Sequence, residues 1–299
     1  SSRSLLIIGV TAKPMKTVLA ISVVIIYGVL LALPVQHRLD HVAFYQSADF
    51  DVIAHRNGRA LAPGNTLEAA VNALAVGADV LELDVHLTAD GVLVVRHDAV
   101  IDTTTNGSGV IAQMTLDEIQ TYEVGYHKVD YPSRVAAKHI KVPTLASVFK
   151  RLPNSRYMVE IKPLDLAAAD KLCGLVVEYR LDEQVLVASF DSSVLRHFRQ
   201  ICPRVPTSLG ESEAYWLVIL SRIGLGHLYH SPGYSVQLPP TYGGLRVLTP
   251  DVIKAAHKQN IRVEAWTVND VVTMRALIDL GIDGIITDYP DILSLLDAD

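Results

Sequence analysis

The chain has 299 residues, half of them hydrophobic, which is enough apolar material for the core of one large domain or two small ones. Its net charge is −6, and no run of lysine or arginine forms a basic stripe, so the composition argues against a nucleic-acid partner. The two cysteines, Cys173 and Cys202, lie outside any CxxC pair. We expect two buried thiols, with a single disulfide as the alternative.

The N-terminal segment contains an uncharged, apolar run over residues 17–36. A run of this length can span a bilayer as one helix, and the absence of a polar face argues against a buried core helix. Three basic residues and no acidic ones precede it: Arg3, Lys13 and Lys16. This bias keeps the N-terminus in the cytoplasm and predicts that the rest of the chain lies outside, in a periplasm, a lumen or the exterior.

We therefore expect residues 1–38 to form a basic segment and a signal-anchor helix that is retained, which makes a membrane one of the partners. The alternative is a cleaved signal peptide, after which the remainder would be secreted. The A-x-A site usual for such cleavage is absent around residues 31–34, and the apolar run is long for a signal peptide.

After a polar linker over 39–50, short β-rich runs alternate with helical patterns over residues 51–299. Nine strands are expected, at 51–54, 80–85, 92–96, 157–162, 185–189, 205–209, 234–238, 262–267 and 284–287. Eight helices are expected, at 65–76, 144–151, 166–179, 192–200, 213–223, 250–259, 271–280 and 290–296. Thr144 and Pro250 are typical of helix starts, and Gly77 and Gly281 of helix ends.

This alternation predicts an α/β fold with a parallel sheet wrapped by helices. The number of units favours a (β/α)8 TIM barrel over an open doubly wound sheet. A barrel holds eight strands, so one of the nine must lie outside it, and we expect this to be 234–238. Residues 100–141 contain a single short helical pattern, at 116–122, and read as an insertion after the third strand. No GxGxxG or P-loop is present, which argues against a nucleotide site.

Residues suited to chemistry recur at the C-terminal ends of the expected strands, where the active sites of such barrels lie. They are His55, Glu82, Asp84, His97, Glu160, Lys162 and Trp266. Glu82 and Asp84 share one face of a strand, because alternate residues point the same way. With Glu160 they form an oxygen-only ligand set, which Mg2+ or Ca2+ prefers. The alternative is a buried network in which these carboxylates pair with lysine or arginine.

The two histidines at strand ends, His55 and His97, flank the acidic pair and are expected to act as acid and base. Arg56 and Lys162 add positive charge, which suits an anionic oxyester and most naturally a phosphate ester. Trp266 is either a wall of the pocket or a core residue.

Six segments, in this order, resemble the glycerophosphodiester phosphodiesterase family: HRNGRALAPGNT, LELDVHLTADGVLVVRHD, EIK, ASF, EAWTVND and GIDGIITDYP. The resemblance covers about residues 52–296 and implies a TIM barrel that hydrolyses glycerophosphodiesters with a bound divalent cation. It implies the following roles: an acid–base pair of His55 and His97, a phosphate contact from Arg56, metal ligands Glu82, Asp84 and Glu160, a phosphoryl-neutralising Lys162 and a pocket-lining Trp266.

Two positions depart from the family pattern of HRG followed by P-E-N-T. Asn57 stands in place of the glycine, and Gly64 in place of the glutamate. In the family that glutamate supports the site and pairs with the arginine of the HR motif, so its loss leaves Arg56 less fixed. We expect activity to survive at a lower rate. The alternative is a weakened or inactive barrel that serves as a binding or structural protein.

The anchor widens the choice of substrate. Soluble headgroup diesters such as glycerophosphocholine are one class, and lysophospholipids cleaved by a lysophospholipase D activity at the membrane are the other. The insertion after His97 and residues 216–220 could supply an apolar lip beside the lipid. For 216–220 we expect an ordinary buried helix face.

Overall fold

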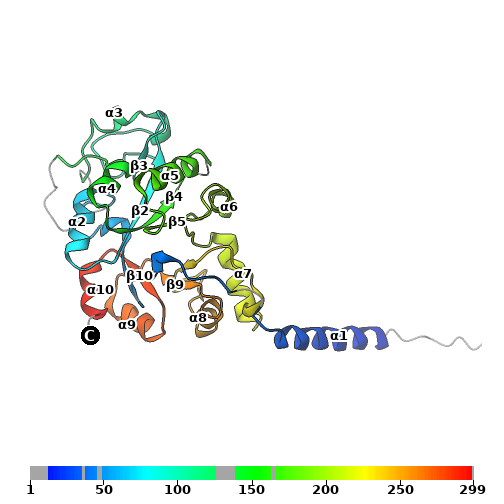
Figure 1. Cartoon of the computed structure of the whole chain (residues 1–299). Helices are drawn as coiled ribbons and strands as arrows, with labels where there is room; N and C mark the ends of the chain where they lie inside the picture. Colours follow the sequence, from blue (N-terminus) through cyan, green and yellow to red (C-terminus); the bar gives the residue numbers. More distant parts are fainter. Residues whose placement is uncertain are drawn as a thin grey trace, which may run out of the picture.

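The computed structural model describes residues 13–35, 38–45, 49–125, 139–162, 164 and 166–297. Its centre is a curled sheet of seven parallel strands in the order β5-β4-β2-β1-β10-β9-β6 (Figure 1). The strands are β1 (Asp51–Ala54), β2 (Val80–Leu87), β4 (Arg156–Ile161), β5 (Val185–Ala188), β6 (Ser235–Leu238), β9 (Arg262–Ala265) and β10 (Gly284–Thr287).

The gap between β5 and β6 is bridged by residues 205–209. Thr207 and Ser208 form isolated parallel bridges to β5 and β6. Ser208 N donates to Val187 O at 2.9 Å, and Leu209 N donates to Ser235 O at 2.8 Å. Pro206 has no N–H to donate, which explains why this segment forms bridges in place of a full strand. The sheet with its bridge is consistent with a (β/α)8 barrel.

The prediction that 234–238 lies outside the barrel is wrong, because this segment is β6 and belongs to the curled sheet. The strand outside is β3 (Leu93–Val95), which pairs antiparallel with β2. Only the short turn over 88–92 joins β2 to β3, whereas a parallel crossover needs a dozen or more residues. Loop length therefore identifies the extra strand.

Eight helices follow the strands of the sheet and its bridge. They are α2 (Leu67–Ala75), α4 (Leu145–Arg151), α5 (Leu166–Tyr179), α6 (Ser192–Ile201), α7 (Glu211–Arg222), α8 (Pro250–His257), α9 (Val271–Asp279) and α10 (Pro290–Asp297). Thr144 caps α4 by accepting a hydrogen bond from Ser147 N, and Pro250 follows the N-cap of α8. Gly77 and Gly281 follow α2 and α9 with φ of 96° and 83°, the left-handed conformation that glycine adopts freely.

The segment expected to be a linker closes the N-terminal end of the sheet. It contains the short helix η1 (Ala43–Tyr45), and Phe44 is buried in the apolar cluster inside the sheet. Arg156 Nη1 donates to Phe44 O at 3.0 Å, and Leu39 N donates to Gln259 O at 3.0 Å. Described residues 38–45 are thus packed against the rest of the domain.

A buried carboxyl lies above this closure. Glu264 on β9 accepts hydrogen bonds from Tyr45 Oη at 2.9 Å and from Gln237 Nε2 at 2.5 Å. Burial raises the pKa of Glu264 to about 7, because the charged form is poorly solvated there.

The cysteines form a disulfide, Cys173–Cys202, so the expectation of two thiols is wrong. Cys173 lies on α5 and Cys202 follows α6, and the packing of these two helices brings their Cα atoms to 5.8 Å. This separation is within the range that a disulfide spans. Sequence spacing alone does not reveal such a contact.

The insertion after β3 is described over 100–125 and 139–141, while 126–138 lie outside the described residues. It contains α3 (Leu116–Ile119), as the pattern at 116–122 predicts, and the short helix η3 (Ile111–Gln113). Buried side chains give the insertion its own apolar cluster: Val94, Ile101, Ile111, Ile119, Val124, Ile140 and Val142.

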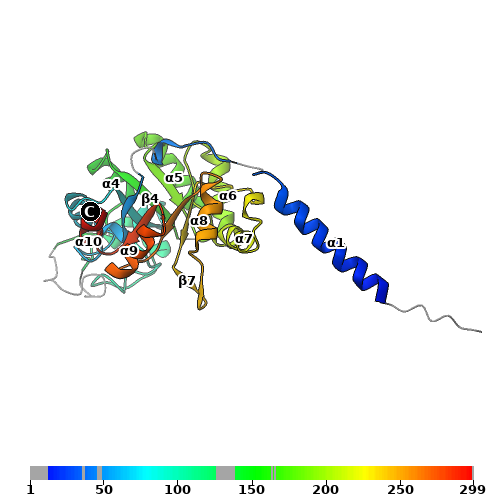
Figure 2. The same cartoon turned by 90° about the horizontal axis from the view of Figure 1, so that it is seen from below.

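The N-terminal helix α1 (Lys13–Ala32) extends away from the sheet, as Figure 2 shows. Over Met15–Ala32 it is long and apolar enough to cross a membrane, and none of that stretch is buried. Its last turns contact the segment after α7. Tyr27 Oη donates to Ile223 O at 2.6 Å, and His227 Nε2 lies 3.1 Å from Leu30 O.

We predict that Glu264→Gln removes a pH dependence of stability. The folded chain holds the proton on Glu264 up to about pH 7, whereas the unfolded chain loses it near pH 4.5, so the wild type loses stability as the pH rises between these values. Relative to the variant, the loss is about 3 kcal/mol. Urea unfolding from pH 4.5 to 7.5 measures it, with the exposed Glu68→Gln as control. A stability difference that is independent of pH would contradict this assignment.

Candidate active site

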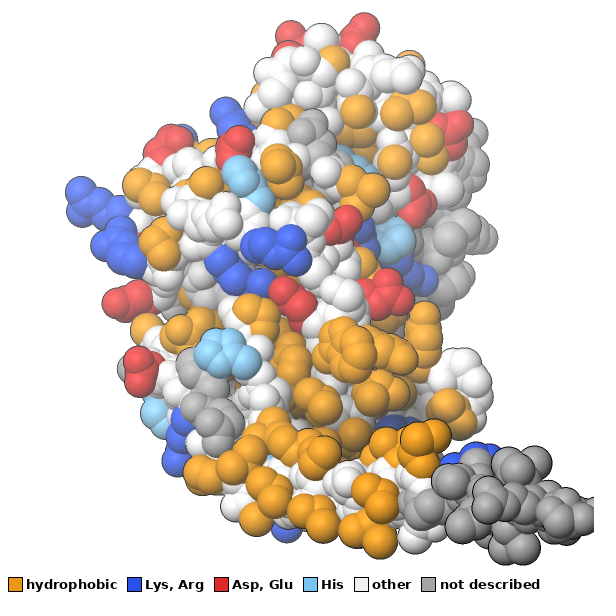
Figure 3. Space-filling model, turned by 90° about the vertical axis from the view of Figure 1, so that its right-hand side faces the viewer, with side chains coloured by type: hydrophobic (Ala, Val, Ile, Leu, Met, Phe, Trp, Pro, Cys, Tyr) orange, Lys and Arg blue, Asp and Glu red, His pale blue; other side chains and the backbone are white. Residues whose placement is uncertain are grey.

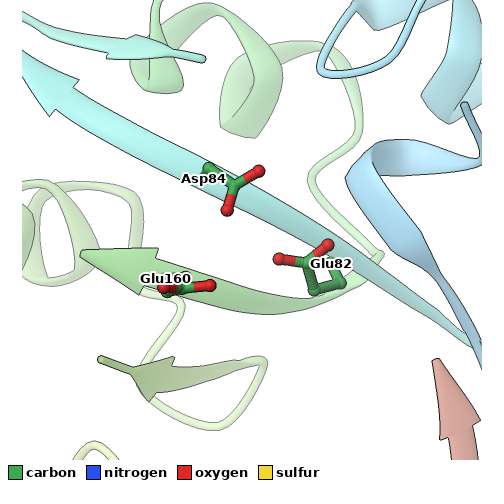
Figure 4. A group of neighbouring side chains, drawn as sticks. All are labelled: Glu82, Asp84 and Glu160. Carbon is green, nitrogen blue, oxygen red and sulfur yellow. The ribbon is translucent and has the colours of Figure 1, made fainter. Parts of the chain in front are cut away.

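Three carboxylates meet at the C-terminal ends of β2 and β4. The two strands are parallel, and their register places Asp84 directly opposite Glu160. Glu82 lies two residues before Asp84 and points the same way. One ligand oxygen from each of Glu82, Asp84 and Glu160 lies within 4.8 Å of the other two (Figure 4). The sequence-predicted ligand set is therefore brought together.

Burial and mutual repulsion act on this cluster. They raise the pKa of Glu82 well above its usual value and that of Glu160 to about 7. Burial opposes the ionisation of Asp84 as well, but the neighbouring Lys162 ammonium holds the pKa of Asp84 below its usual value. Lys162 Nζ lies 3.0 Å from Asp84 Oδ1 and 2.9 Å from Glu160 Oε2.

One lysine is thus shared by two of three buried acids. The set consists of oxygen donors, which are the ligands that Mg2+ and Ca2+ prefer, and a divalent cation would offset the remaining repulsion. These residues therefore fit a hard divalent cation. Lys162 pairs with two of these carboxylates, as the alternative of a buried charge network predicts. The same three carboxylates also fit a cation, so neither interpretation excludes the other.

His97 is held by residues next to it in the chain. It follows β3, and Arg96 N donates to Asp84 O at 2.9 Å, which fixes this segment against the end of β2. His97 Nδ1 lies 2.7 Å from Asp98 Oδ1, and Asp98 Oδ2 accepts from Thr103 Oγ1 at 2.5 Å. Burial lowers the pKa of His97, which favours the neutral imidazole of a general base.

His55 is oriented by a residue far away in the sequence. It begins the short helix η2 (His55–Asn57) directly after β1, and its Nδ1 lies 2.5 Å from Asp288 Oδ1. Asp288 follows β10, the strand next to β1. Asn269 holds it with two hydrogen bonds: Asn269 Nδ2 donates to Asp288 Oδ2, and Asp288 N donates to Asn269 Oδ1. Sequence reasoning missed Asp288 as a site residue, although its place directly after a strand was a usable signal.

The loop after β1 wraps around the carboxylates. Arg56 N donates to Glu82 Oε2 at 2.7 Å, and Arg56 Nε lies 3.9 Å from Asp84 Oδ2. Asn65 donates from Nδ2 to Asp84 Oδ2 at 2.8 Å and accepts from Asp84 N at 3.2 Å. Asn65 is a second residue that sequence reasoning missed. Its bidentate contact holds Asp84 toward the centre of the site.

The two departures from the family pattern have separate structural consequences. Asn57 adopts φ 62°, a left-handed conformation that suits glycine and that asparagine tolerates better than most residues. At Gly64, an added Cβ would lie 2.9 Å from Arg59 Cβ and 3.4 Å from Arg56 Cβ. Arg59 itself lies 3.6 Å, through Nε, from Asp288 Oδ1. Arginine side chains therefore crowd position 64.

The predicted residues surround one cavity of about 480 Å3. Seven of them line it: His55, Arg56, Glu82, His97, Glu160, Lys162 and Trp266. Asp84 is buried behind them, in contact with Lys162. Trp266 donates from Nε1 to Gln237 O at 3.2 Å, and its ring packs edge-on against Phe190 with centroids 5.5 Å apart. Trp266 thus forms part of the wall of the cavity.

Comparisons with known proteins show the family to which the chain is similar. The model of the glycerophosphoryl diester phosphodiesterase family matches residues 55–292. A glycerophosphodiester phosphodiesterase from Caldanaerobacter subterraneus subsp. tengcongensis is 33% identical over 251 residues, covering 81% of this chain and 95% of that protein. A lysophospholipase D from Mus musculus is 25% identical over 262 residues, covering 80% of this chain and 79% of that protein.

Solved structures show the same fold. The crystal structure of a glycerophosphodiester phosphodiesterase from Agrobacterium tumefaciens aligns with a TM-score of 0.67 at 26% identity, covering 82% of this chain and 99% of that chain. The matched family model, the relative at 33% identity and the curled parallel sheet lead to one conclusion: the chain belongs to the glycerophosphoryl diester phosphodiesterase family.

Proposed function

We propose that this chain hydrolyses glycerol-based phosphodiesters to glycerol 3-phosphate and an alcohol, with a divalent cation and two histidines. The observation that carries the proposal is the buried cluster of three carboxylates in the wall of a cavity that also holds His55 and His97. In the reaction, a new P–O bond forms to the nucleophile and the P–O bond to the leaving alcohol breaks.

The cation would be held by Glu82, Asp84 and Glu160, whose oxygen donors favour Mg2+ or Ca2+. When bound, such a cation polarises the phosphoryl group and lowers the pKa of the attacking hydroxyl. Lys162 and Arg56 line the same cavity and take up the charge that develops on the phosphoryl oxygens.

The two histidines move the protons. Asp288 and Asp98 each face the Nδ1 of one histidine, so Nε2 is the nitrogen of each ring that serves the substrate. One histidine removes a proton from the nucleophile, which is either water or a free hydroxyl of the substrate's own glycerol. In the second case a cyclic phosphate forms, and water then opens it to give glycerol 3-phosphate. The other protonates the leaving alkoxide.

For the location of the protein, we propose that α1 anchors the chain in a membrane and that the catalytic domain lies outside the cytoplasm. The apolar, unburied stretch Met15–Ala32 supports the anchor. The disulfide supports an oxidising compartment, since disulfides are rare in the cytosol. Cleavage of the helix would instead leave a secreted enzyme.

We propose that the site is active despite Gly64. Asp84 retains Asn65, His55 retains Asp288, and His97 retains Asp98, so one proposed metal ligand and both histidines keep their supports. Loss of the family's glutamate removes a negative charge next to Arg56 and leaves room that Arg59 partly fills.

Metal dependence tests the proposed function most directly. Protein stripped with EDTA is expected to lose glycerophosphocholine hydrolysis, and Mg2+ or Ca2+ to restore it. Glu82→Gln removes one ligand charge and should raise the metal concentration for half-maximal activity by about tenfold or more. Metal titration by calorimetry and choline release measure these effects, with the exposed Glu68→Gln as control. Full activity in EDTA would overturn the metal assignment.

Asp288→Asn tests the orientation of His55. Loss of the carboxylate leaves the ring tautomer unfixed, so kcat should fall by about 10²-fold or more with little change in stability. The matched control is Asp170→Asn, which alters a similar histidine–aspartate pair at the surface, Asp170 with His197. Steady-state kinetics compare the two variants. Equal kcat in both would remove Asp288 from the catalytic machinery.

Gly64→Glu separates an active from a weakened barrel. The new Cβ must displace Arg59, which should cost about 1–3 kcal/mol of stability, and activity should change less than about threefold. Gly64→Ala imposes the same crowding without a carboxylate and is the control. Kinetics and urea unfolding measure both variants. A gain of tenfold or more in kcat for the glutamate variant alone would favour the weakened barrel.

A further inference from the structure

The cavity has a second wall that the proposed chemistry does not use. This part of the lining comes from α7, β6 and the segments next to them, and it is largely apolar, although Glu211 and Gln237 of the same elements also line the cavity. Its apolar side chains are Leu209, Ala214, Val218, Leu238, Tyr242 and Val247. Glycerol, phosphate and small headgroup alcohols are polar and gain nothing from such a wall, whereas a hydrocarbon chain gains by leaving water.

Exposed apolar side chains lie in the cavity lining or next to lining residues. Trp216 on α7 is 56% exposed, and Tyr242 and Leu245 on the β7–β8 hairpin (Thr241–Tyr242, Leu245–Arg246) are 65% and 64% exposed. Phe190 and Tyr215 are exposed as well. Figure 3 shows hydrophobic side chains gathered on this face above α1. We call these five residues the apolar rim.

The rim changes the interpretation of residues 216–220. Leu217 is fully buried and Val218 nearly so, as expected for a buried helix face, but Trp216 points to solvent. Two hydrogen bonds attach the hairpin to α7: one from Tyr242 Oη to Glu211 Oε1, the other from Arg222 Nη2 to Arg246 O. Trp216 and the hairpin therefore belong to one surface.

This surface is continuous with α1. Tyr27 and Leu30 of α1 contact Ile223 and His227, directly after α7. The twelve residues of α7 span about 18 Å, so the rim at its start lies close to the point where α1 attaches. In Figure 2 the hairpin that contains β7 points down from the domain, and α1 runs to the lower right.

Cationic side chains border the attachment point. A second cavity, of about 420 Å3, lies where α1 meets α7 and α8, and its lining includes Arg222, Lys254 and Lys258. Positive side chains beside the end of an apolar helix suit the phosphates of lipid headgroups. The apolar rim and the cationic border thus both lie beside α7 and the segment after it, where the apolar helix attaches, and this combination favours a bilayer as the occupant of this surface.

We propose that the apolar wall binds the acyl chain of a single-chain glycerophospholipid, which enters the cavity from the membrane across the apolar rim. The inference rests on the proposed function and specifies its substrate class. Water attacks phosphorus, the P–O bond to the headgroup alcohol breaks, and the products are a lysophosphatidate and the free alcohol. For lysophosphatidylcholine that alcohol is choline.

The test uses the full chain in detergent micelles with divalent cation present. Choline release is measured from glycerophosphocholine and from lysophosphatidylcholines with chains of 8, 12 and 16 carbons. For substrate that is monomeric in water, each buried methylene adds a factor of about four to binding, so kcat/KM expressed per concentration of monomeric substrate should rise at least about tenfold from 8 to 12 carbons. Cleavage of glycerophosphocholine with no gain along the series would overturn the acyl site alone. No cleavage of any substrate would overturn the proposed function.

Two sets of variants locate the site. Val218→Phe fills the apolar wall and should lower the ratio of 16-carbon to 8-carbon cleavage at least about tenfold, while Val177→Phe on the exposed face of α5 should not. The double variant Trp216→Ser/Leu245→Ser alters exposed positions and is expected to fold. It should lower cleavage of the 16-carbon substrate in vesicles relative to glycerophosphocholine at least about fivefold. Unchanged ratios in both sets would contradict the proposal.

Discussion

Mutual repulsion among three buried carboxylates is the constraint on which the site depends. One oxygen from each of Glu82, Asp84 and Glu160 lies within 4.8 Å of the other two, with Glu82 and Asp84 buried and Glu160 partly buried. Negative charges that lie close together away from water raise each other's pKa and destabilise the folded chain unless positive charges balance them. Lys162 provides part of the balance from within the chain, and a bound cation would offset the negative charge that remains.

Much of this arrangement could be predicted from the sequence, because local pattern determines it. The spacing of Glu82 and Asp84 fixes their common face, and the placement of Glu160 at the end of a strand brings it alongside. The element boundaries follow from caps and glycines that act within a few residues, as at Thr144 and Gly77.

What could not be predicted depends on contacts between distant segments. Asp288 becomes a partner of His55 only because β1 and β10 are neighbours in the closed order of strands. The disulfide likewise requires the packing of α5 on α6. The misplaced strand has another cause: repetitive β-rich runs look alike, and the decisive information was the length of the turn after β2.

The packed segment after α1 has a consequence for how the enzyme would meet its substrate. Leu39 is already bonded to the catalytic domain at Gln259, so only residues 33–38 separate it from the end of α1. Fully extended, they reach roughly 20 Å. With α1 in a membrane as proposed, this short linker keeps the domain close to the membrane surface and away from solutes in bulk water. The enzyme would then meet its substrate by lateral diffusion of lipid into a small patch of membrane around each anchor. The rate of this two-dimensional encounter depends on the density of substrate in the leaflet.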